Sequence, residues 1–198
     1  CSTYCIKATA FQEATVQDAY LRRQKDRLLS PMAGPLFATV HPNVVSVIAL
    51  FIGLGSVGAI MGNFYGIGLI LWAVNRIMDG LDGVIARVHQ KQSDFGGFLD
   101  LFLDFVIYLT VPVAFLWALP TTVNLWAGIA LLGSYVMNSI SWTTLAALLE
   151  KRNRQTVNRL TSMEMPTGLI EGAETIVFYT LFYFFPEHVA LLFSVMAV

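Results

Sequence analysis

Four aspartates lie within a short stretch of this 198-residue chain, and their spacing is typical of a site that binds divalent metal ions. Asp79 and Asp82 are three residues apart, and Asp100 and Asp104 are four apart. In helices, each pair would therefore share one face. The short turn expected between the two helices would fold them antiparallel and bring the two pairs together.

The negative charge of these aspartates needs compensation in an apolar environment. Each carboxylate within a membrane costs about 2.5–3.5 kcal/mol, and four close together also repel one another. Arg76 and Arg87 can pair with two of them, so a charge network that only stabilises helix packing would leave negative charge unmatched. Two divalent cations would balance all four, and oxygen ligands select magnesium, calcium or manganese. Magnesium usually binds substrate phosphates as well, so we expect a phosphate-bearing substrate.

Glycines surround the acidic residues, at positions 80, 83, 96 and 97. A glycine lets a bulky ligand approach the backbone closely, although in membrane helices small residues also serve helix packing. Four of them around one acidic cluster favour a ligand cradle. Arg87 follows at the end of the same expected helix, where its guanidinium can bond a diphosphate oxygen.

This stretch resembles the signature of the CDP-alcohol phosphotransferase family. Eight fixed residues with fixed gaps match it: Asp79-x2-Asp82-Gly83-x2-Ala86-Arg87-x8-Gly96-x3-Asp100-x3-Asp104. The start of the first apolar run, His41-Pro42-Asn43, is also similar to that family's.

The resemblance implies a role for each matched residue. The first three aspartates would bind a pair of Mg²⁺ or Mn²⁺ ions, and Asp104 would complete the metal set and act as the general base. The cytidine diphosphate part of the donor would contact four residues: Gly83, Ala86, Arg87 and Gly96. The family's enzymes are six-helix membrane proteins, commonly homodimers, with a cytosol-facing active site open laterally to lipid.

The composition requires the bilayer as the solvent for most of the chain. Hydrophobic residues make up 56% and charged residues 13%, with a mean hydropathy of +0.65, whereas a soluble domain has about 25% charged residues. Long apolar runs without alternation predict an all-α integral membrane bundle of six transmembrane helices. The expected spans are 43–62, 66–87, 94–118, 122–149, 167–185 and 187–198. The last is shorter than the roughly 20 residues of a full span, so we expect a truncated sixth helix. Because the chain starts at Cys1 rather than Met and ends inside an apolar run, we also expect it to be trimmed at both ends.

The basic residues predict the orientation of this bundle. Apart from Arg76, every Lys and Arg lies before the first span, near the second-to-third turn, or in the fourth-to-fifth loop. By the positive-inside rule, those segments and the active site face the cytoplasm of an inner or plasma membrane. Residues 1–41 would form a cytoplasmic segment whose residues 19–29 make an amphipathic interfacial helix, or an ordinary solvated one. Residues 42–198 would form the six-helix membrane domain.

The acceptor alcohol is less well defined by the sequence. Arg152 and Arg154 lie in a basic loop that either binds an acceptor phosphate or only follows the positive-inside rule. Glu171, in the fifth expected span, either holds acceptor hydroxyls or pairs with a base such as Arg76. The two features favour different acceptors, and the sequence leaves both open.

The expected reaction is transfer of a phosphatidyl group from CDP-diacylglycerol to a small polyol or polyol phosphate, as in phosphatidylglycerophosphate or phosphatidylinositol(-phosphate) synthesis. The alternative within the family is headgroup transfer from CDP-choline or CDP-ethanolamine to diacylglycerol. An intramembrane prenyltransferase also uses paired aspartates and magnesium, but its acidic motifs lie far apart in sequence. A cation transporter would favour acids near the bilayer midplane. We expect membrane lipids and no nucleic acid as further partners.

Overall fold

The computed structural model describes residues 40–153 and 172–198, and every regular element in these ranges is helical. The helices are α2 (Pro42–Met61), α3 (Tyr65–Val88), α4 (Asp94–Ala118), α5 (Thr122–Asn153), α6 (Gly172–Phe184), the 3₁₀ turn η2 (Pro186–His188) and α7 (Val189–Ala197). The predicted all-α class is confirmed. The expected interfacial helix at 19–29 lies outside the described residues and stays a prediction.

Local sequence explains where the helices near the site begin. Pro42 opens α2, and the His41 side chain accepts a hydrogen bond from the Asn43 backbone N–H at 3.3 Å. Ser93 caps α4, where its hydroxyl accepts from the Gly96 N–H at 3.0 Å. Such caps satisfy the free N–H groups of a first helical turn.

Among the described residues, three helices are long and apolar enough to cross a membrane: α2, α4 and residues Thr122–Leu148 of α5. Helix α3 has the length of a span but carries four charged residues: Arg76 at its centre, and Asp79, Asp82 and Arg87 in its C-terminal half. In the described residues, α6 covers 172–184 of the predicted fifth span 167–185. Helix α7 covers 189–197 of the predicted sixth span 187–198. The segments Thr175–Phe184 and Pro186–Ala197 are bent by 114° relative to each other, and they form a fourth crossing if together they are one broken span.

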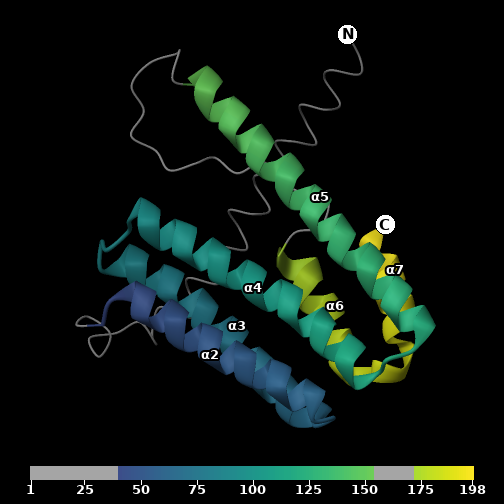
Figure 1. Cartoon of the computed structure of the whole chain (residues 1–198). Coiled ribbons are helices and arrows are strands. Elements are labelled where there is room, and N and C mark those ends of the chain that lie inside the picture. Colours follow the sequence, from purple (N-terminus) through teal and green to yellow (C-terminus); the bar gives the residue numbers. More distant parts are fainter. Residues whose placement is uncertain (1–39, 154–171) are drawn as a thin grey trace, which may run out of the picture.

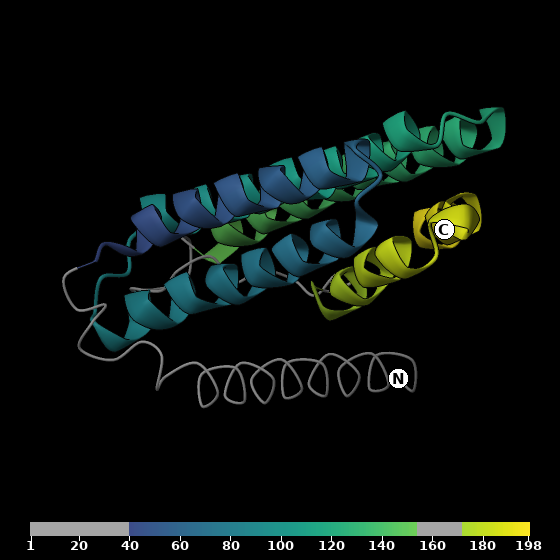
Figure 2. The same cartoon turned by 90° about the horizontal axis from the view of Figure 1, so that it is seen from below.

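Helices α2, α3 and α4 lie side by side, and α5 packs against α7 (Figure 1). Viewed from below, the start of α2 and the α3–α4 turn lie at the same end of the bundle (Figure 2). The core further along is aromatic, with Trp72, Phe115, Tyr179, Phe182 and Phe193 fully buried. Helix α2 packs against both α3 and α4 and brings the C-terminal half of α3 near the first half of α4.

Gly53 permits the close approach of α2 to α4. A Cβ atom at this position would lie 2.6 Å from Ile107 Cδ1, closer than real side chains come. Gly53 thus serves helix packing, as small residues often do in membrane helices. Gly58 does not, because a Cβ there would meet nothing within 4 Å.

Candidate active site

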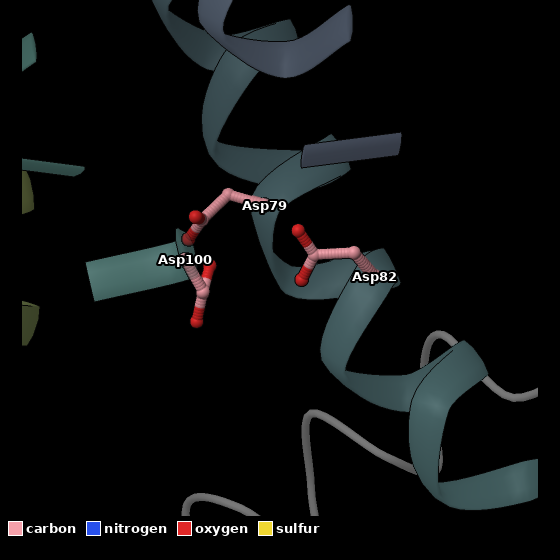
Figure 3. Close-up of side chains that lie close together, drawn as sticks. All are labelled: Asp79, Asp82 and Asp100. Atoms are coloured by element: carbon pink, nitrogen blue, oxygen red, sulfur yellow. The ribbon is translucent and has the colours of Figure 1, made fainter. Parts of the chain in front are cut away.

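Three of the predicted aspartates converge between α3 and α4. Asp79 and Asp82 come from α3 and Asp100 comes from α4, and their carboxylates point toward one another (Figure 3). One carboxylate oxygen from each lies within 4.8 Å of the other two. Asp82 is buried, and the other two are half-buried. Three hard oxygen donors at this spacing fit a divalent cation such as Mg²⁺ or Mn²⁺.

Helix α2 supplies a hydrogen bond to this cluster that the sequence did not predict. The Ser46 hydroxyl donates to Asp82 Oδ2 at 2.5 Å, and both side chains are buried. Such outer hydrogen bonds orient metal-ligating carboxylates. A lone serine in an apolar run does not by itself predict this role. The one feature of the sequence that points to it is its position about one turn after His41-Pro42-Asn43.

The fourth aspartate, Asp104, lies outside the three-residue cluster and pairs with Arg76. Its Oδ1 accepts from Arg76 Nη2 at 2.8 Å, and Arg76 Nη1 lies 3.8 Å from Asp79 Oδ2. The prediction that Arg76 pairs with an aspartate of the motif is confirmed, and it contacts two of them. The Arg76 side chain is only 8% exposed, so this charge acts in a medium with little solvent screening.

A small pocket opens where the two parts of the site meet. Helices α2, α3 and α4 all line it, and its polar lining consists of Ser46, Asn75, Arg76, Asp79, Asp100 and Asp104. The pocket therefore exposes a concentrated negative charge, relieved by one guanidinium, to any bound phosphate ester.

The residues predicted to contact cytidine diphosphate lie at the same end of the bundle. A Cβ at Gly83 would lie 3.3 Å from Arg87 Nη1, so the exposed Arg87 side chain lies over this glycine. A Cβ at Gly96 would lie 3.2 Å from Asn43 Oδ1. Both glycines thus face polar side chains, and Ala86 is half-buried. Their roles in donor binding stay predictions.

The structure does not describe the side chains of the three residues predicted to contact the acceptor. Arg152 lies in the last turn of α5, but its side chain is not described. Arg154 and Glu171 lie outside the described residues. All three stay predictions.

Comparison with known proteins supports the interpretation of the motif. The family model for CDP-alcohol phosphatidyltransferase matches residues 39–198. The chain is 33% identical over 171 residues to the inner membrane protein YnjF of Escherichia coli, covering 81% of this chain and 82% of that protein.

Two further relatives are much longer than the stretch they share with this chain. The bifunctional IPC transferase and DIPP synthase of Aquifex aeolicus is 34% identical over 91 residues, which are 45% of this chain and 21% of that protein. Its namesake from Archaeoglobus fulgidus is 32% identical over 115 residues, which are 56% of this chain and 23% of that protein. The apolar helices, the aspartate motif and the family match agree: the chain belongs to the CDP-alcohol phosphatidyltransferase family and is an integral membrane enzyme of that class.

Proposed function

We propose that this enzyme transfers a phosphatidyl group from CDP-diacylglycerol to a small polyol or polyol phosphate and releases CMP. The observation that carries the proposal is the convergence of Asp79, Asp82 and Asp100 within 4.8 Å at one end of the bundle. A diphosphate donor is itself negative, so it would approach this cluster only with cations between the two.

Two divalent ions, Mg²⁺ or Mn²⁺, would supply charge neutralisation of the diphosphate and polarisation of its phosphoryl oxygens when bound. The three clustered aspartates would hold them, and Asp104 would complete the set across the pocket. Ser46 orients Asp82 for this task through its 2.5 Å hydrogen bond. The donor set fits the ions, because three carboxylates each offer an oxygen within 4.8 Å of the other two, and hard oxygen donors suit a divalent cation.

The reaction forms a bond between the acceptor oxygen and the lipid-side phosphorus. The bond from that phosphorus to the bridging oxygen breaks, and CMP leaves with the electron pair. Asp104 would accept the proton of the acceptor hydroxyl, whose high pKa makes unassisted attack slow. Arg87, above Gly83, would hold a diphosphate oxygen and stabilise the charge that develops on the leaving group.

The proposal includes the setting of the enzyme. The site would face the cytoplasm of the inner or plasma membrane, because Arg87 and Lys91 lie at the same turn as the aspartates. Water-soluble acceptors would reach it from that side, and the lipid donor would enter laterally. A homodimer is expected from the family resemblance.

The test uses purified protein in lipid nanodiscs with CDP-diacylglycerol, Mg²⁺ and separate acceptors: glycerol 3-phosphate, inositol, inositol phosphate and serine. We expect acceptor-dependent release of CMP with one polyol or polyol phosphate. A parallel reaction supplies CDP-choline and diacylglycerol. If CMP were released only in that parallel reaction, the enzyme would instead be assigned headgroup transfer to diacylglycerol. No CMP release under any condition would refute the proposed function.

A further inference from the structure

Arg76 is held by more contacts than charge compensation requires. Its guanidinium makes four hydrogen bonds: Nε and Nη2 to Asn75 Oδ1 at 2.9 and 2.8 Å, Nη1 to Tyr108 Oη at 2.9 Å, and Nη2 to Asp104 Oδ1 at 2.8 Å. The Trp72 and Tyr108 rings lie 4.8 and 5.1 Å from its central carbon. A simple counter-ion needs none of this geometry.

The contacts other than Asp104 are anchored independently of the acidic cluster. Asn75 is buried and donates its amide to the Ala49 carbonyl of α2 at 2.7 Å. The backbone carbonyl of Tyr108 accepts a hydrogen bond from Tyr179 of α6 at 2.5 Å. Helices α2, α4 and α6 thus fix the guanidinium, directly or through one side chain, before Asp104 is considered. The guanidinium thus has partners on other helices besides the Asp104 carboxylate, to which it donates at 2.8 Å.

Arg76 also links two groups of carboxylates. It holds Asp104 at 2.8 Å and lies 3.8 Å from Asp79, one of the three aspartates whose arrangement suits a metal ion. We propose that Arg76 is a positioning residue that holds the Asp104 carboxylate beside the metal cluster in the orientation required of the base. The inference rests on the proposed function only for the base role of Asp104.

Replacement of Arg76 by lysine separates positioning from charge. Arg76→Lys keeps the formal charge, but one ammonium group cannot bond Asn75, Tyr108 and Asp104 in the fixed geometry of the guanidinium. We expect kcat to fall by roughly 10- to 100-fold, the scale of a small misplacement of a catalytic group. The KM for CDP-diacylglycerol should change by less than about threefold, because the donor contacts remain.

Manganese binding without donor gives a second readout, independent of turnover. Since the charge is conserved, a tighter Mn²⁺ dissociation constant in Arg76→Lys would report that Asp104 has moved toward the ion. We expect about tenfold tighter binding by electron paramagnetic resonance, on the scale of outer-ligand effects. Adding Asp104→Asn in the lysine background should remove this gain.

Two further variants keep the test decisive. Ser56→Ala removes a buried hydroxyl that bonds the Gly68 carbonyl and Tyr183, ten residues or about 15 Å along α2 from Ser46. It should lower the melting temperature and leave kcat and Mn²⁺ binding unchanged. If Arg76→Lys does not fold, Asn75→Ser decides the question, because it loosens the guanidinium and leaves every charge in place.

Wild-type kcat and Mn²⁺ affinity in a folded Arg76→Lys, or in Asn75→Ser where the lysine variant does not fold, would overturn the inference and leave Arg76 as a counter-ion. A tightening that persists in the Asp104→Asn background would overturn it as well, because the effect would then not pass through Asp104. Failure of the proposed function has a different signature: the wild-type protein would release no CMP, while the Mn²⁺ comparison would still report the position of Asp104.

Discussion

Replacing Ser46 by alanine tests whether α2, which carries no acidic residue of the motif, takes part in the metal site. The serine hydroxyl donates to Asp82 Oδ2 at 2.5 Å, and both residues are buried, with exposed fractions of 7% and 3%. Ser46→Ala removes the donor without adding volume. The Asp82 carboxylate then lacks this bond and the orientation that it fixes.

The size of the effect follows from two independent estimates. A hydrogen bond to a charged group contributes about 1.5–3 kcal/mol. Loss of an outer-ligand partner typically weakens metal affinity by about 10- to 100-fold, which is about 1.4–2.7 kcal/mol at 1.36 kcal/mol per factor of ten. The two ranges agree, so we expect the Mn²⁺ dissociation constant of Ser46→Ala to rise by at least about tenfold.

The assay titrates Mn²⁺ into purified protein and follows the free ion by electron paramagnetic resonance. The metal concentration for half-maximal CMP release should shift in parallel, while kcat at saturating metal stays near that of the wild type. Ser56→Ala again serves as the control, because it removes a buried hydroxyl remote from the aspartates. An unchanged Mn²⁺ affinity in Ser46→Ala, with the protein folded, would refute the orienting role of Ser46.

Four further predictions follow. Asp104→Asn should lower turnover by about 10²–10⁴-fold, the usual contribution of a general base, and leave CDP-lipid binding intact; normal turnover would exclude the base role. Arg152→Ala should raise the KM for a phosphorylated acceptor by roughly tenfold. An unchanged KM would mean that the basic loop only follows the positive-inside rule and does not bind the acceptor. Removing metal with EDTA should stop CMP release, and Mg²⁺ or Mn²⁺ should restore it; release that continues in EDTA would refute metal dependence. Gly53→Ala should lower stability by about 1–3 kcal/mol, measured by thermal unfolding, because its Cβ would meet Ile107; an unchanged melting temperature would contradict the close packing.

The helices were largely predictable because their ends are marked by residues with strong local preferences. The expected span 94–118 coincides with α4, which begins after the Ser93 cap. The expected span 122–149 ends four residues before α5 does. Charge marks where a helix leaves the apolar layer, but Glu, Lys and Arg are good helix formers, so the helix continues beyond that point.

The acidic cluster was predictable for a similar reason, since helical periodicity and a short turn are enough to bring the pairs together. Arg76 was recognised because a charge inside a span is conspicuous. Asn75 and Tyr108 were not, although both bond its guanidinium. Uncharged polar residues are common in membrane helices, and their partners depend on helix rotation, which hydropathy does not define.

The role of α2 shows what the spacing of small residues adds once the packing is known. Ser46, Ala49 and Gly53 are separated by three and four residues and therefore share one face of the helix. Ser46 bonds Asp82, the Ala49 carbonyl accepts from Asn75, and Gly53 leaves room for Asn75 and Ile107. One face of an apolar helix thus supports both halves of the site, the metal cluster through Ser46 and the Arg76–Asp104 pair through Asn75. Substitutions on this face should therefore affect metal binding and turnover separately, according to which of the two halves they contact.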